Sequence, residues 1–140
     1  NHDYRSNGKT VYTKMFGSTN SSFIAGAYKF ILFDDIVWEN GNKSPLYEWL
    51  VDQLTDTSHL NVVVTHIPPW SDQMEGLNNL TFKQIVTKSN TILCLHGHTH
   101  SFSDDFYNGI RTIVSGDIAD GEYLEISMIG SKINVEKIKF

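Results

Sequence analysis

The stretch Thr91-Ile92-Leu93-Cys94-Leu95-His96-Gly97-His98-Thr99-His100 carries the strongest indication of the fold. Its first five residues predict a buried strand, and Gly97 permits a sharp turn directly after that strand. Two histidines follow, two positions apart. If the backbone is extended there, the two rings point the same way and can reach one position. Neutral imidazole is the commonest metal ligand in proteins, so the stretch predicts a metal site at a strand end.

A second strand ends at a histidine in the same way. Residues 60–65 predict a buried strand that ends at His66, and Pro68 and Pro69 prevent its continuation. In open α/β sheets, functional sites gather outside the carboxyl ends of the strands. We therefore expect the rings of His66 and His98 to lie close together at one edge of a sheet.

The order of the predicted elements indicates an α/β fold. Buried strands are predicted over residues 28–34, 60–65 and 91–95. A helix is predicted over 45–54, with Ser44 as its N-cap and Pro45 at its first position. A second helix is predicted from Thr81 to about Ser89, where Thr81 and Gln84 form a capping box and Leu80 packs onto Ile85.

The C-terminal third of the chain predicts strands alone. Asn108-Gly109 predicts the type I′ turn of a hairpin over 102–115, and Gly130-Ser131 the turn of another over 122–139. Together with the preceding strands and helices, these hairpins predict a layered α/β sandwich with an antiparallel C-terminal portion. Residues 4–27 are polar and predict an irregular loop with a short helix near 11–16.

Three motifs together resemble the C-terminal part of a calcineurin-like metallophosphoesterase. That family carries Gly-Asn-His-Asp/Glu, His-x-Pro-Pro-type and Gly-His-x-His motifs, which correspond here to Asn1-His2-Asp3, His66-Ile67-Pro68-Pro69 and Gly97-His98-Thr99-His100. Its two upstream motifs, Asp-x-His and Gly-Asp-x-x-Asp/Asn, have no counterpart in these 140 residues. The resemblance implies that residues 1–140 are one domain, the C-terminal portion of an αββα-type sandwich of mixed sheets that is truncated at its N-terminus.

The resemblance also implies the chemistry and the metal ligands. The expected reaction is the hydrolysis of a phosphomonoester or phosphodiester, small or large, by metal-bound hydroxide at a dinuclear site. Asn1, His66 and His98 would bind one metal ion, and His100 would bind the other. Ligation by histidine, asparagine and carboxylate suits manganese, iron or zinc, so two such divalent ions are the expected cofactors.

Two residues of the first motif receive catalytic roles from the resemblance. His2 would donate a proton to the leaving oxygen, and Asp3 would hold His2 in the correct tautomer. His96 matches no motif position and is interpreted as structural or as a support for the metal ligands. Six acids also lie outside the motifs and are interpreted as turn and surface carboxylates: Asp34, Asp35, Asp104, Asp105, Asp117 and Asp120.

Three other interpretations remain open, because the upstream acidic ligands are absent from this sequence. The chain could be an inactive or incomplete metal-binding fragment that needs an upstream segment for activity. It could be one half of a split enzyme whose N-terminal segment is a separate piece. It could also be a mononuclear zinc hydrolase that uses His66, His98 and His100.

Charge and hydropathy narrow the classes of partner. The formal net charge is −5 without a basic stripe, so no nucleic-acid partner is predicted. No apolar run is long enough to predict a membrane-spanning segment. The single cysteine, Cys94, cannot form a disulfide within the chain and is interpreted as a small buried apolar residue.

Overall fold

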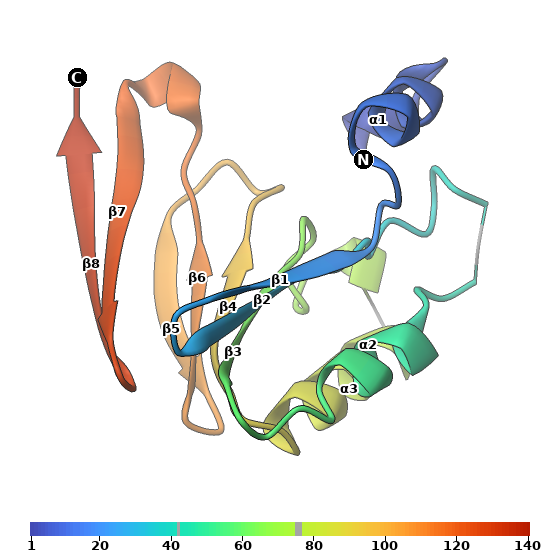
Figure 1. Ribbon diagram of the computed structural model, residues 1–140. Coiled ribbons are helices and arrows are strands. Elements are labelled where there is room, and N and C mark those ends of the chain that lie inside the picture. Colours follow the sequence, from blue (N-terminus) through green and yellow to red (C-terminus); the bar gives the residue numbers. More distant parts are fainter. Residues whose placement is uncertain (42, 75–76) are drawn as a thin grey trace.

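The computed structural model describes residues 1–41, 43–74 and 77–140 (Figure 1). Six strands form one mixed sheet in the order β1-β2-β3-β4-β6-β5. Their bounds are Ser21–Ala25 (β1), Tyr28–Leu32 (β2), Leu60–Val64 (β3), Thr91–His96 (β4), Ser103–Tyr107 (β5) and Ile110–Val114 (β6). The four inner strands are parallel, and β1 and β5 are antiparallel edges. The strands that lead to the two histidine motifs, β3 and β4, are therefore direct neighbours that end at the same edge.

Two helices cover one face of this sheet. They are α2 (Tyr47–Gln53) and α3 (Leu77–Thr87). Leu50 of α2 and Phe82 of α3 are buried in one apolar cluster with Ile31, Val63 and Cys94 of the sheet. Alternate residues of the inner strands are apolar on this side, so the helices and the sheet bury a continuous core between them.

A two-stranded hairpin covers part of the opposite face. Its strands are β7 (Glu122–Ile129) and β8 (Lys132–Lys139), and they pair over their whole length. Every second residue of β7 is partly buried, and Leu124 and Ile126 pack against Val62 and Leu93 of the sheet. Figure 1 therefore shows three layers in sequence: helices, mixed sheet and hairpin.

The prediction of an α/β fold with an antiparallel C-terminal portion is confirmed. Asn108 and Gly109 both have positive φ, 47° and 84°, as the predicted type I′ turn requires. A second helix layer, which the αββα arrangement implies, is not observed among the described residues. Figure 1 shows no helix on the outer side of the β7–β8 hairpin in the described part of the chain.

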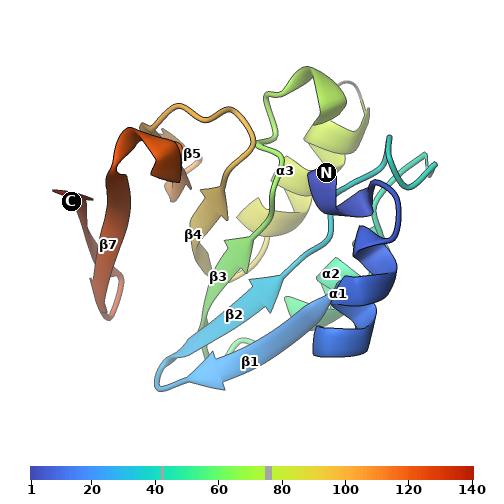
Figure 2. The same ribbon diagram turned by 90° about the horizontal axis from the view of Figure 1, so that it is seen from above.

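The N-terminal quarter is more regular than its sequence predicts. Residues His2–Tyr4 form a 3₁₀ turn, α1 spans Gly8–Phe16, and β1 was not predicted at all. Most of β1 is exposed and polar at its start, so its sequence lacks the apolar character that marks a buried strand. Figure 2 shows that α1 and the N-terminus lie on the side to which the arrows of β2 and β3 point. This placement brings the first motif to the carboxyl ends of the strands.

Both predicted helix starts are wrong by a few residues. The N–H of Tyr47 donates to the carbonyl of Pro45 at 2.9 Å, so a turn precedes α2, whose N-cap is Leu46. Thr81 lies inside α3, because that helix already begins at Leu77. Leu80 lies inside α3 as well and is 54% exposed, so it does not precede an N-cap as the predicted staple requires. Composition indicates these helices, whereas their ends depend on contacts elsewhere in the fold.

Candidate functional site

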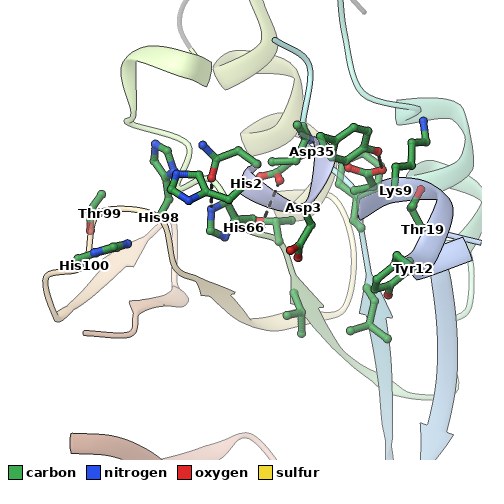
Figure 3. A pocket seen from close by; sticks show the side chains of 18 residues that line it. His2, Asp3, Lys9, Tyr12, Thr19, Asp35, His66, His98, Thr99 and His100 are labelled. Carbon is green, nitrogen blue, oxygen red and sulfur yellow. Dashed lines mark hydrogen bonds between the residues drawn. The ribbon is translucent and has the colours of Figure 1, made fainter. Parts of the chain in front are cut away.

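A cavity of about 820 Å³ opens at the carboxyl ends of β2, β3 and β4. All six residues to which the resemblance gives a role line this cavity: Asn1, His2, Asp3, His66, His98 and His100. They come from sequence positions almost 100 residues apart. Figure 3 shows His2, His66 and His98 around one part of the cavity, with His100 at its far side. The fold therefore gathers the three motifs around one hollow.

His66 follows β3 and contacts the N-terminal motif. Its Nε2 lies 2.9 Å from the Oδ1 of Asn1, whose amide nitrogen donates to Oε1 of Glu39 at 3.1 Å. Burial is the main cause that lowers the pKa of His66, to about 4, and the neighbouring positive charges act in the same direction. The ring is therefore neutral at pH 7, which is the form that ligates a metal.

His98 lies beside His66, as expected. The ring centroids are 5.2 Å apart and the rings meet nearly edge to face, at 78°. The N–H of Gly97 donates to the carbonyl of His66 at 3.0 Å and ties the two strand ends together. The backbone here is not extended, because His98 has a φ of 68° and the N–H of Thr99 donates to the carbonyl of Gly97 at 2.8 Å. Such left-handed backbone is costly for a residue with a Cβ.

His100 faces a different partner. Its φ is 57°, and its Nδ1 lies 2.9 Å from Oδ2 of Asp117, with 68% of the side chain exposed. The Oδ1 of Asp117 also accepts the N–H of Ala119 at 2.9 Å and caps a short 3₁₀ helix. In the described ranges, no three or more His, Cys, Asp or Glu side chains are grouped to hold a metal ion. The expectation that His66, His98 and His100 converge on one position is therefore wrong for His100.

The first motif lies at the mouth of the cavity. His2 and Asp3 are exposed, and neither side chain forms a hydrogen bond or an ion pair within the described part of the chain. The tautomer-holding contact between Asp3 and His2 is thus not formed in this structure. Gly8 packs directly against this turn, because a Cβ at Gly8 would lie 2.0 Å from the carbonyl oxygen of Asp3. Helix α1 therefore fixes where the motif can be.

Asp35 is the residue that sequence reasoning missed. Its side chain is 1% exposed, and it accepts the N–H of Ile67 at 2.8 Å and the N–H of His66 at 3.2 Å. Its interpretation as a turn or surface carboxylate is wrong. Burial raises the pKa of Asp35 to about 7, although these hydrogen bonds act in the opposite direction. Its place just after β2 obeys the same strand-end rule that pointed to His66, and that signal could have found it.

Asp34 and Asp104 also have specific partners. Asp34 accepts a hydrogen bond from the hydroxyl of Tyr4, and burial, followed by this contact, raises the pKa of Tyr4. Asp104 forms a two-point ion pair with Arg111, at 2.8 and 2.6 Å, which lowers the pKa of Asp104. Neither acid reaches His66 or His98 through a hydrogen bond or an ion pair. Asp34 and Asp104 therefore hold the surrounding loops and strands together.

His96 does not line the first cavity and is almost completely buried. Its exposed fraction is 5%, and its Nδ1 lies 2.7 Å from the hydroxyl of Thr65. Burial lowers its pKa to about 4. Because Thr65 precedes His66, this contact joins the ends of β3 and β4 on the helix-covered side of the sheet.

The donor set fits one metal position better than two. Asn1 Oδ1 and His66 Nε2 lie within hydrogen-bond distance, 2.9 Å, and the ring of His98 adjoins them, so three donor side chains are gathered at this position. The second position retains His100 alone, and that ring is paired with Asp117.

Comparison with known proteins leaves the family open. No family model and no curated protein matches this sequence. Among solved structures, the chain is similar to the solution NMR structure of the Thermotoga maritima protein TM1076, with a TM-score of 0.45 and 16% sequence identity. The match covers 91% of this chain and 58% of that one, so this chain spans less than two thirds of that protein's length. No described helix is both long and apolar enough to cross a membrane.

Proposed function

We propose that this chain carries part of a metal-dependent phosphoesterase site and takes part in the hydrolysis of a phosphomonoester or phosphodiester. The observation that carries the proposal is the contact of Asn1 with His66, beside the ring of His98, at the ends of two parallel strands. In the sequence, Asn1 lies 65 or more positions away from His66 and His98. Their convergence in one cavity supports the resemblance on which the function rests.

Asn1, His66 and His98 would hold one divalent ion. Asn1 is uncharged because its side chain is an amide, and the lowered pKa of His66 keeps that ring neutral at pH 7. A bound divalent ion would neutralise charge on the phosphoryl oxygens and lower the pKa of the attacking water. The cavity of about 820 Å³ leaves room for a phosphoester beside this position.

His2 is the proposed proton donor to the leaving oxygen. It lines the same cavity, is exposed, and has no competing hydrogen bond within the described residues. Its ring can therefore turn towards a substrate that the cavity holds. Asp3, in the same 3₁₀ turn, would orient that ring once a substrate is bound.

A metal-binding module that needs further acidic ligands is the second candidate. The observation in its favour is that His100 is paired with Asp117, which leaves the second metal position without a set of donors among the described residues. On this proposal the isolated chain binds one metal and hydrolyses phosphoesters slowly or not at all. The mononuclear zinc alternative has less support, because it requires His100 to join His66 and His98.

Calorimetry with Mn²⁺ and Zn²⁺ tests the proposal on the 140-residue chain. We expect one weak site per chain, and His98→Ala should weaken binding at least tenfold, the order of effect known for groups around a metal. His59→Ala is the matched control, because His59 pairs with Asp56 away from the cavity and should leave binding unchanged. An absence of metal binding in the wild type, or equal binding by His98→Ala, would refute the metal site.

Hydrolysis of nitrophenyl and alkyl phosphoesters in the same samples separates the two candidates. If the chain is active, His2→Ala should lower turnover without changing metal affinity, and by more on the alkyl ester, whose leaving group needs a proton. One metal site without any turnover would favour the module that lacks ligands. Equal loss on both esters would remove His2 from the proton-donor role.

A further inference from the structure

A second cavity lies on the helix-covered face of the sheet. It has a volume of about 260 Å³ and shares no lining residue with the first cavity. Its walls come from α3, from strands β4 to β6 and from the segment after Pro68. The lining is mainly aromatic and apolar, with Trp70, Phe82, Phe106 and Tyr107 among its members.

A residue that lines this cavity carries a buried nitrogen without a hydrogen-bond partner in the described part of the chain. His96 lines the cavity and is 5% exposed, and its Nε2 is buried and forms no hydrogen bond with any described residue. The other ring nitrogen, Nδ1, is bound to Thr65, which lines the first cavity instead. The two nitrogens diverge from one shared ring carbon, so Nε2 is directed away from Thr65, and His96 itself lines the second cavity. A buried polar atom left unpaired is costly, so a ligand that pairs with it would gain stabilisation.

The walls around His96 suit a flat ring. Trp70 and Phe82 meet the imidazole nearly edge to face, with centroids 6.0 and 6.2 Å away. Trp70 and Phe106 are 46% and 71% exposed, so aromatic surface reaches solvent beside the cavity. An aromatic guest placed here would contact ring edges and faces on several sides.

We propose that this cavity binds a small aromatic molecule that carries a hydroxyl group, of the phenol class. A hydroxyl both donates and accepts, so it complements Nε2 whichever nitrogen of His96 carries the proton. A cavity of about 150 Å³ already accepts benzene, so the larger volume here accommodates one substituted ring. This inference concerns residues outside the first cavity and does not depend on the phosphoesterase proposal.

Phenol and toluene are matched probes, because they differ mainly in the hydroxyl group. The ¹⁵N signals of the histidine rings report directly which nitrogen gains a partner in the wild-type chain. Phenol should shift the Nε2 signal of His96 in a saturable way, and should bind roughly two- to tenfold more tightly than toluene, as one net hydrogen bond allows. If phenol leaves this signal unchanged, or if both probes bind equally, the proposal is overturned and the cavity holds only water.

Two variants sharpen the test. His96→Leu keeps an apolar side chain of similar reach but removes the nitrogen, so it should still bind toluene and lose the preference for phenol. His59→Leu removes a histidine outside both cavities and should keep that preference. A preference for phenol that survives in His96→Leu would contradict the assigned partner. If His96→Leu does not fold, the wild-type ¹⁵N titration alone decides the outcome.

Discussion

The buried carboxyl of Asp35 should make stability depend on pH in a direction unusual for an acid. Burial raises its pKa from 3.8 to about 7 in the folded chain. Between these values the folded state holds a proton that the unfolded state has lost, so stability falls as pH rises. Below about 4 both states are protonated, and above about 7 both are ionised, so the contribution of Asp35 is constant there.

The magnitude follows from the size of the shift. Each pH unit within this window is worth about 1.4 kcal/mol, so the contribution of Asp35 should fall by about 3 kcal/mol between pH 5 and pH 8. Asp35→Asn removes the titration. The substitution also replaces one of the two oxygen acceptors with an amide nitrogen. The buried N–H of either His66 or Ile67 then lacks an acceptor, and this loss costs about 1–3 kcal/mol at every pH.

Urea unfolding followed by tryptophan fluorescence, at pH 5, 6, 7 and 8, measures this effect. The quantity to compare is the free energy of unfolding of the wild type minus that of Asp35→Asn, because the contributions of His66 and His96 cancel in the difference. Those two histidines have lowered pKa values and alone would make the protein less stable as pH falls from 6.5 to 4. We expect this difference to fall by about 3 kcal/mol from pH 5 to pH 8, so the wild type loses stability relative to Asp35→Asn as the pH rises.

Asp104→Asn gives a contrasting control. The exposed ion pair with Arg111 lowers the pKa of Asp104. Asp104 therefore stabilises the folded chain at neutral pH and loses this effect on acidification, which is the opposite pH dependence to that of Asp35. A wild-type minus Asp35→Asn difference that stays constant from pH 5 to pH 8 would refute the argument that a buried, protonated Asp35 supports the His66 backbone.

Two further substitutions test packing. Gly8→Ala should displace the N-terminal motif, because its Cβ would lie 2.0 Å from the carbonyl of Asp3, and an unchanged ¹⁵N spectrum of the His66 ring would contradict this. Asn61→Leu should raise the free energy of unfolding by about 1–3 kcal/mol, since Asn61 is fully buried with both side-chain polar atoms unpaired. Asn134→Leu, on the exposed face of β8, is the control in urea unfolding. If Asn134→Leu and Asn61→Leu change the free energy of unfolding equally, the burial of Asn61 does not cause the effect.

The sequence alone determined those features that depend on only a few neighbouring residues. Apolar runs predicted the inner strands β3 and β4, and Asn108-Gly109 predicted the turn between β5 and β6. The two strand-then-histidine junctions predicted that His66 and His98 would meet, because parallel neighbours end at the same edge of a sheet. These predictions rest on side-chain alternation and turn chemistry, which need no knowledge of distant contacts.

Only the tertiary structure decided the features that depend on distant partners. Asp35 is buried because the backbone of His66 and Ile67, more than thirty residues away, donates to it. His100 turns to Asp117 because the backbone after Gly97 is left-handed rather than extended, and no local pattern distinguishes those conformations for histidine. In each case the free energy of a polar group depends on whether water or a protein partner surrounds it, and the packing of distant segments sets that surrounding.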